Sequence, residues 1–165
     1  MKREFPIFLV GVFFLTFATL TYEVALSYEF AYMFWFEASV AILSTAMFGL
    51  GIGGVLGYFL QGRYPGNYYR LIRLSIFTFG MTLFLSLYFI ASGSRAELVE
   101  LSPAASSMLF RLGFNPAEIV PLLYFSLAAA LPFVFSGIAL SLALNYPGRE
   151  KRAISYIYFA DLFGA

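Results

Sequence analysis

The sequence predicts an all-α membrane protein, a polytopic helix bundle with four full transmembrane helices followed by a truncated fifth. Three observations indicate this class. Apolar residues make up 61% of the 165 residues, charged residues make up only 12%, and the mean hydropathy is +0.84. A soluble domain carries about 25% charged residues, so half of that share indicates lipid as the solvent. The apolar residues also gather in long runs, and a helix needs about 20 such residues to cross a hydrocarbon core.

The chain divides into five apolar segments joined by shorter polar connections. Backbone polar groups in hydrocarbon must pair within their own segment, so each segment is predicted to be a helix. The four full spans are residues 5–26, 36–60, 71–91 and 116–144. The fifth segment, 153–165, is about 20 Å long as a helix and is too short to cross. We treat 1–165 as a single transmembrane domain and expect it to be the N-terminal fragment of a longer protein.

Positive charge is distributed unevenly between the two predicted sides of the membrane. Only Arg95 and Arg111 fall on one side. Eight fall on the other: Lys2, Arg3, Arg63, Arg70, Arg73, Arg149, Lys151 and Arg152. Because short cytoplasmic segments of membrane proteins are enriched in Lys and Arg, this asymmetry predicts a cytoplasmic N-terminus. The predicted location is the cell (cytoplasmic) membrane.

Composition excludes several kinds of site. The sequence has no Cys and no His, which removes thiolate ligands, disulfides, cysteine nucleophiles and imidazole bases. The sequence also lacks a serine–base pair, a phosphate-binding loop and a cluster of metal ligands. We therefore predict no catalytic residue, no metal and no cofactor in this chain. The net charge of +1 gives no basis for nucleic-acid binding, and the lipid bilayer is the first predicted partner.

A glycine-rich stretch lies inside the second span. Residues 49–54 match the spacing of a dinucleotide-binding loop, but that loop requires a strand before it and a helix that begins at it. Read as part of a helix, Gly49, Gly53 and Gly57 are each four residues apart and form one smooth stripe. Such a stripe predicts close packing against a neighbouring helix. Self-association in a homo-oligomer is the alternative use of this face.

A proline interrupts the fourth span. Pro132 cannot donate to the carbonyl of Ala128, so a kink is predicted there. Most such kinks are structural, and a hinge for transport is the alternative.

Two acidic residues inside spans are the candidate intramembrane polar residues. Glu23 lies beside Tyr22 in the first span, and Asp161 lies about nine residues into the fifth, roughly 13 Å deep. An acid near the bilayer centre costs at least ~2.5 kcal/mol, so it should face protein or water. Each acid is either a helix-packing contact or part of a cation or proton site. Glu37 and Glu118 lie at span ends, where interface and capping roles explain them.

Three short phrases, taken in order, resemble a known family. They are LTYEV at 20–24, MFGLGIGG at 47–54 and YFADLFGA at 158–165. This order resembles the membrane-embedded N-terminal domain of spermidine/spermine synthase-like proteins, the polyamine aminopropyltransferase family. In that family a multi-pass, transporter-like domain precedes a soluble catalytic domain. The resemblance implies that Glu23 and Asp161 are characteristic polar residues of the membrane domain.

Two main functional hypotheses follow. In the first, the chain is an integral membrane domain that anchors or serves an aminopropyltransferase whose soluble catalytic domain is absent from this sequence. In the second, it is a small transporter or half-transporter for a small polar or cationic solute, with Asp161 as the coupling group. A third possibility is a structural subunit that binds a partner protein through residues 92–115. Under the first hypothesis the chain alone does not catalyse aminopropyl transfer.

Overall fold

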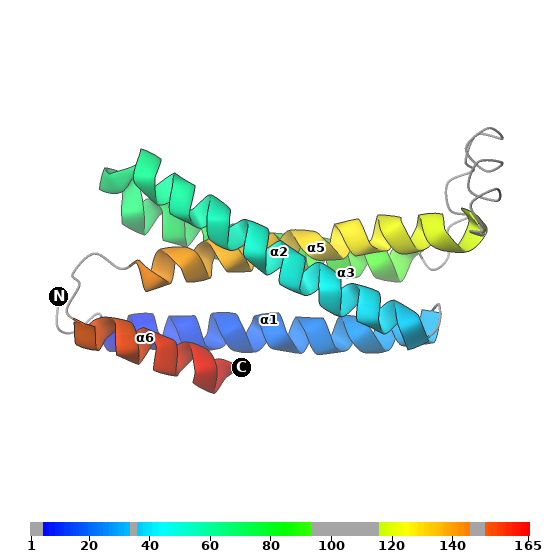
Figure 1. The fold of residues 1–165 in the computed structure, drawn as a ribbon, viewed down its shortest axis with the longest axis horizontal. Coiled ribbons are helices and arrows are strands. Elements are labelled where there is room, and N and C mark those ends of the chain that lie inside the picture. Colours follow the sequence, from blue (N-terminus) through cyan, green and yellow to red (C-terminus); the bar gives the residue numbers. More distant parts are fainter. Residues whose placement is uncertain (1–4, 34–35, 94–115, 146–150) are drawn as a thin grey trace.

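The computed structural model describes residues 5–33, 36–93, 116–145 and 151–165 (Figure 1). These residues form five helices and contain no strand, so the all-α prediction is confirmed. The helices are α1 (Phe5–Met33), α2 (Phe36–Arg63), α3 (Tyr68–Gly93), α5 (Pro116–Leu144) and α6 (Lys151–Gly164), with a short 3-10 helix, η1 (Pro65–Asn67), between α2 and α3. Most of the connection 92–115, which the third hypothesis invokes, lies outside the described residues.

Four of these helices are long and apolar enough to cross a membrane, which confirms the multi-pass prediction. The qualifying segments are Phe5–Tyr32, Ile42–Arg63, Tyr68–Ser92 and Leu123–Leu144. Several helices extend beyond the predicted spans. The first helix runs seven residues beyond the predicted end at 26, and the third and fifth begin earlier than predicted. The hydropathy pattern marks where the apolar run stops, whereas backbone hydrogen bonding continues into the polar interface.

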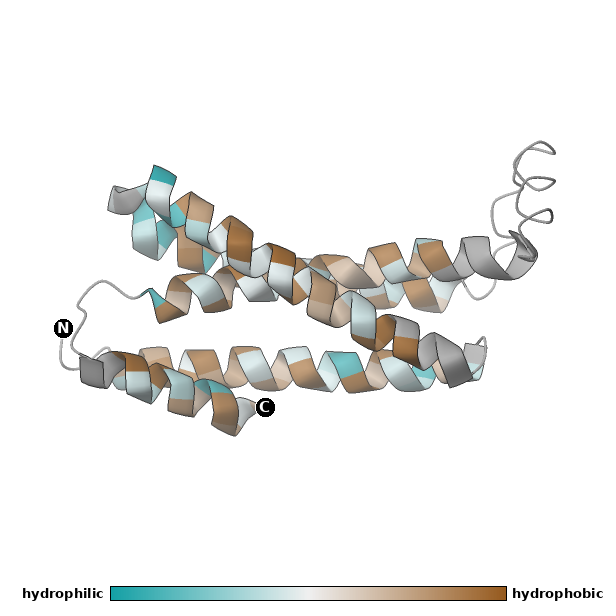
Figure 2. Ribbon diagram, in the orientation of Figure 1, coloured by the Kyte–Doolittle hydropathy of each residue, from teal (hydrophilic) through white to brown (hydrophobic). Residues whose placement is uncertain are grey.

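The helices form two groups (Figure 1). The first comprises α2, α3 and α5, with both α2 and α3 packed against α5. The second comprises α1 and α6, where α6 lies along the N-terminal half of α1. The groups meet where α2 crosses α1 and where α1 runs beside α5. Brown, hydrophobic residues dominate the middle of the long helices, and teal residues are more frequent toward their ends (Figure 2).

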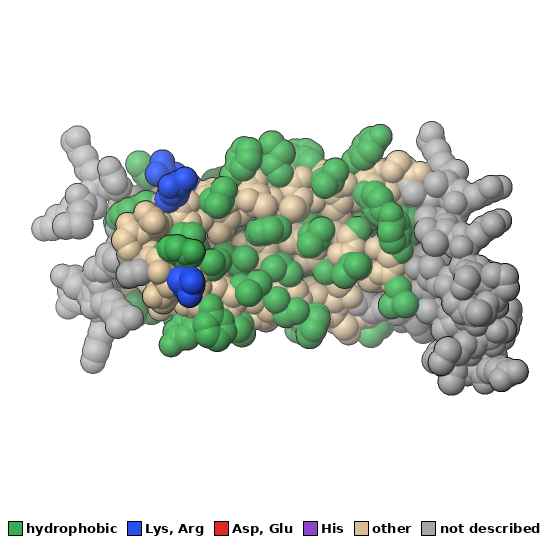
Figure 3. Space-filling model, turned by 90° about the horizontal axis from the view of Figure 1, so that it is seen from above, with side chains coloured by type: hydrophobic (Ala, Val, Ile, Leu, Met, Phe, Trp, Pro, Cys, Tyr) green, Lys and Arg blue, Asp and Glu red, His purple; other side chains and the backbone are tan. Residues whose placement is uncertain are grey.

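The outer surface has the character expected of a lipid-facing protein. Hydrophobic side chains are spread over the described part of the face shown in Figure 3, and the described Lys and Arg side chains on that face gather near one end. Arg63, at the end of α2, and Arg70 and Arg73, in the first turns of α3, are all exposed. The side of the membrane on which this end lies stays a prediction from the charge asymmetry.

The predicted glycine stripe faces α5. A Cβ added at Gly49 would lie 2.8 Å from Cβ of Phe133, and one added at Gly57 would lie 2.8 Å from Cβ of Ser141. At Gly53 the added atom would strike the α5 backbone itself. The absence of three side chains therefore lets the two helices approach to backbone contact, as small residues permit in membrane proteins.

Pro132 lies on the same inner side of the bundle. Its side chain is fully buried, and α5 continues through it as one helix from Pro116 to Leu144. The kink predicted at this position stays a prediction.

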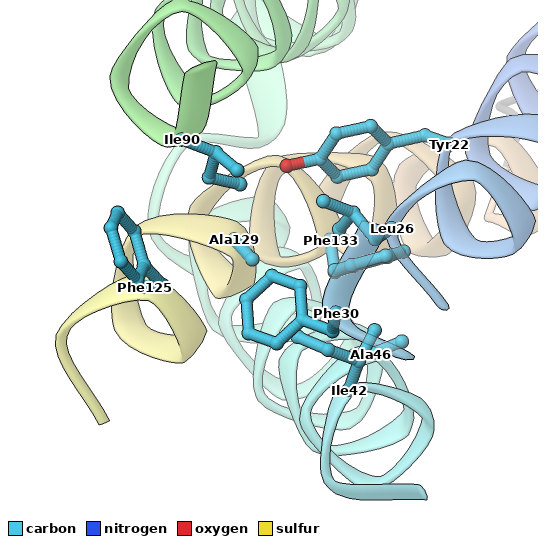
Figure 4. Packing of buried hydrophobic residues seen from close by; sticks show 9 residues of the cluster. All are labelled: Tyr22, Leu26, Phe30, Ile42, Ala46, Ile90, Phe125, Ala129 and Phe133. Carbon is cyan, nitrogen blue, oxygen red and sulfur yellow. The ribbon is translucent and has the colours of Figure 1, made fainter. Parts of the chain in front are cut away.

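Helices α1 and α5 run antiparallel in a fixed register. The Thr19 and Ser136 hydroxyls are 2.6 Å apart, and the rings of Tyr22 and Phe133 have centroids 5.2 Å apart. A step of three residues toward the C-terminus of α1, from Thr19 to Tyr22, thus matches a step of three residues toward the N-terminus of α5, from Ser136 to Phe133. Further along, side chains of α1, α2, α3 and α5 form one buried cluster (Figure 4): Tyr22, Leu26, Phe30, Ile42, Ala46, Ile90, Phe125, Ala129 and Phe133.

Candidate functional site

Asp161 is held by a hydrogen bond between α6 and α1. The Thr16 hydroxyl donates to the Asp161 carboxylate over 2.7 Å. The same hydroxyl also lies 3.2 Å from the carbonyl of Val12, one turn earlier, which is the longer of its two contacts. Helix α6 comes this close because Gly164, one turn after Asp161, packs against the Phe13 carbonyl. The acid predicted to face protein therefore does so, half-buried against α1.

Two further hydroxyl pairs connect α1 to the other helix group. Thr19 and Ser136 join α1 to α5, and the Tyr22 and Ser86 hydroxyls, 2.6 Å apart, join α1 to α3. All four side chains are buried. Residues 16, 19 and 22 follow one another at intervals of three, so they line one face of α1. From this face, Thr16 contacts α6, Thr19 contacts α5 and Tyr22 contacts α3.

The Thr16–Asp161 and Thr19–Ser136 contacts border a cavity of about 220 Å³ between α1, α2, α5 and α6, which we call the Glu23/Asp161 cavity. Its lining combines two carboxyl side chains and three hydroxyls with apolar residues. The lining residues are Leu15, Thr16, Thr19, Leu20, Glu23, Leu50, Ser136, Leu140, Asp161 and Ala165. The structure thus brings together the two candidate acids, which come from opposite ends of the sequence.

Glu23 lies one turn beyond Thr19 and is half-buried. Side chains on a helix lean toward its N-terminus, so the Glu23 carboxyl is carried back toward the cavity. In the described part of the chain this carboxyl makes no hydrogen bond or ion pair. It differs in this respect from Asp161, which Thr16 holds in place.

Among the side chains that the structure describes, none that lines the cavity is basic. The arginines whose side chains are described, Arg63, Arg70 and Arg73, lie in the last turn of α2 and the first turns of α3. Among the described residues, no group of three or more Asp, Glu, His or Cys side chains is placed to hold a metal ion. The described lining therefore offers two carboxyl groups and three hydroxyl oxygens, and it contains no basic side chain.

A larger hollow of about 600 Å³ lies between α2 and α5, but it has a different character. Its polar lining consists of the hydroxyls of Ser44, Thr45 and Ser126, and the remaining lining residues are apolar or glycine. None of its described lining residues is charged, so this lining lacks the chemistry of a site for an ionic solute.

We compared the chain with known protein families, curated proteins and solved structures. None of them matches this chain. The resemblance to spermidine synthase-like proteins therefore rests on the three sequence phrases, and the function has to be argued from the site.

Sequence reasoning found the two acids but missed the hydroxyls that surround them. Thr16, Thr19 and Ser136 are common residues in membrane helices, and none stands out in an apolar segment. A signal was present, since Thr16, Thr19 and Glu23 fall at intervals of three and four and thus share a helix face. Ser136 had no such signal, because its partner lies on another helix.

Proposed function

We propose that this chain is a membrane domain that binds a small ammonium-bearing solute in the Glu23/Asp161 cavity. The observation that carries the proposal is that Glu23 and Asp161 line one cavity whose described side chains include none that is basic. We place the domain in the cytoplasmic membrane with its N-terminus in the cytoplasm, which the distribution of Lys and Arg supports.

The charge of the lining favours a cationic solute. A carboxylate removed from water needs an opposite charge or hydrogen bonds, and one close to hydrocarbon needs them most. A cationic solute supplies that charge, and its N–H groups find acceptors in the hydroxyl oxygens of Thr19 and Ser136.

The size of the cavity distinguishes between kinds of cation. About 220 Å³ exceeds the room that one water molecule or a bare metal ion needs. Only two acidic side chains line the cavity, and among the described residues no group of three or more Asp, Glu, His or Cys side chains is placed to hold a metal ion. An organic ammonium fits both facts.

Two uses of such a site are consistent with the sequence. In a spermidine synthase-like protein, the domain would anchor the enzyme and hold a cationic amine close to it. This use is supported by the sequence phrases, two of which contain Glu23 and Asp161. In a transporter or half-transporter, the same cavity would hold the solute during its passage, and the depth of Asp161 in its helix favours this second use.

Binding of 1,4-diaminobutane to the purified chain in lipid nanodiscs tests the proposal. We expect saturable binding, weakened about tenfold or more by Asp161→Asn and by Glu23→Gln, because each substitution removes one charge-assisted hydrogen bond. Asparagine still accepts from Thr16, so the fold should persist. Glu29→Gln is the matched control, since Glu29 is exposed on the same helix as Glu23.

The proposal fails if the unaltered chain shows no saturable binding, or if both cavity variants bind as well as the control. Uptake of the same diamine into proteoliposomes then separates the two uses. Uptake that Asp161→Asn abolishes supports the transporter, whereas binding without uptake supports the anchoring domain.

A further inference from the structure

Positive charge collects at the end of the bundle where α2 is joined to α3. Arg63 lies in the last turn of α2, and η1 connects it to α3, whose first two turns carry Arg70 and Arg73. All three side chains are exposed. Because Arg70 and Arg73 are three residues apart on a helix, they are neighbours on one of its faces. This end of the bundle therefore presents three guanidinium groups outward.

No acidic side chain of the neighbouring sequence balances this charge. The chain contains no Asp or Glu between Glu37 and Glu97, a stretch that includes the whole of α3. None of the three arginines forms an ion pair with another described residue. Two of them also lie near the N-terminus of a helix, where the helix dipole is already positive and disfavours a basic side chain. An anion bound here would relieve this uncompensated charge.

The start of α3 is fixed to the rest of the bundle. The buried Tyr68 donates its hydroxyl to the carbonyl of Leu142 on α5 over 3.0 Å. One turn later, Nε of Arg73 donates to the carbonyl of Tyr69 over 3.1 Å. This bond orients the guanidinium and leaves its two terminal NH₂ groups without a partner among the described residues. Such a planar fork matches the spacing of phosphate oxygens.

An apolar stripe continues the face of α3 that begins at Arg70. Its four side chains follow at alternating intervals of four and three residues, and each is 58–74% exposed: Leu74, Phe77, Met81 and Phe84. From Leu74 to Phe84 the helix rises about 15 Å, which is half of the ~30 Å hydrocarbon core. The stripe is therefore as long as the acyl layer of one leaflet, and it starts at the arginines.

We infer that Arg70 and Arg73, with Arg63 beside them, bind the phosphate of an anionic glycerophospholipid whose acyl chain lies along the stripe from Leu74 to Phe84. The arginines supply the charge and the donors for the phosphate, and the stripe supplies an apolar contact for the chain. A zwitterionic lipid also carries a cationic group, which the three arginines repel. No residue of the Glu23/Asp161 cavity takes part, so the inference does not rest on the proposed function.

Two lipids with identical acyl chains test this site. The purified chain in detergent micelles is titrated with dioleoyl phosphatidylglycerol, which is anionic, or with dioleoyl phosphatidylcholine, which is zwitterionic. Native mass spectrometry measures the fraction of the protein that carries one lipid, and this fraction gives an apparent Kd. We expect a Kd about tenfold lower for phosphatidylglycerol, because several basic residues near a membrane surface act together on an anionic headgroup.

Arg70→Gln and Arg73→Gln are each expected to raise the Kd for phosphatidylglycerol about fivefold, the factor that corresponds to about 1 kcal/mol per basic residue at a membrane surface. Both side chains are exposed, so the fold should persist, and unchanged binding of phosphatidylcholine reports that it does. Arg70→Lys keeps the charge and should keep the preference for phosphatidylglycerol. Arg95→Gln is the matched control, since it removes the same charge two residues beyond the other end of α3.

Four results would overturn the inference. The two lipids might bind the unaltered chain equally well, Arg70→Gln might weaken both lipids to the same extent, or Arg95→Gln might raise the Kd for phosphatidylglycerol as much as Arg70→Gln does. The fourth is displacement of the lipid by an equal concentration of sn-glycerol 3-phosphate, which would show that the arginines take a soluble phosphate without any contribution from the stripe. None of these results changes the expected binding of a diamine in the Glu23/Asp161 cavity, so the two proposals fail separately.

Discussion

Replacing Gly53 by alanine is expected to destabilise the bundle by about 3 kcal/mol or more, the upper part of the range for overpacked interiors. The added Cβ would strike the Val134 carbonyl and lie 3.0 Å from the Cα of Gly137. Both contacts are with α5 backbone, which no side-chain rotation can move away. The two helices must therefore move apart, and the close contacts that α5 makes with Gly49 and Gly57 are lost as well. The measurement is the free energy of unfolding in mixed detergent micelles.

The chain provides matched controls for this substitution on the same helix. A Cβ added at Gly51 or Gly54 would meet no atom within 4 Å. Gly51→Ala and Gly54→Ala should therefore leave stability unchanged or raise it by up to about 1 kcal/mol, because alanine favours helix over glycine. Equal losses in all three variants would show that α2 and α5 do not pack through Gly53.

Phe133→Ala is expected to cost about 2–3 kcal/mol of unfolding free energy. Phe133 is 0% exposed and contacts both the Tyr22 ring and the smooth face of α2 at Gly49. Truncation of a buried phenylalanine in a water-soluble protein costs about 3–5 kcal/mol. Part of that cost comes from transfer out of water and is smaller here, since the separated helices remain in lipid. The remaining part of the cost is the packing energy lost around the new void that the truncated side chain leaves.

The comparison variant is Phe77→Ala, which removes the same atoms from a side chain of α3 that is 62% exposed. In micelles or bilayers this position faces the apolar solvent, so we expect a change within about 0.5 kcal/mol. A loss at Phe77 as large as that at Phe133 would mean that the inner and outer faces of the bundle are assigned wrongly.

Much of the architecture could be predicted from the sequence because the solvent enforces it. The lengths of the apolar runs predicted four spans, and the protein has helices at all four positions. The ends of α1 and α3 were predicted less well, because tyrosines and other interfacial residues continue a helix beyond the apolar run. The glycine spacing predicted a smooth face on α2 but could not say which helix it meets.

The candidate site was predictable only in part. Glu23 and Asp161 are rare acids in apolar segments, so their burial cost alone identifies them. Their proximity to one cavity could not be read from the chain, because it depends on how α6 lies against α1 and how α1 lies against α5. The hydroxyls of Thr19 and Ser136 acquire their significance only from that contact.

The sequence by itself determined that the chain forms apolar helices, which of their residues are too polar to face lipid, and where one helix is smooth enough for close approach. These properties follow from composition and from the 3.6-residue period of the helix, both of which are local. The tertiary structure alone decided that Gly53 meets α5, that Thr16 holds Asp161, and that Tyr22 reaches Ser86. Each of these pairs joins distant segments, and in lipid the pairing of helices depends on side-chain packing and hydrogen bonds that no single segment contains.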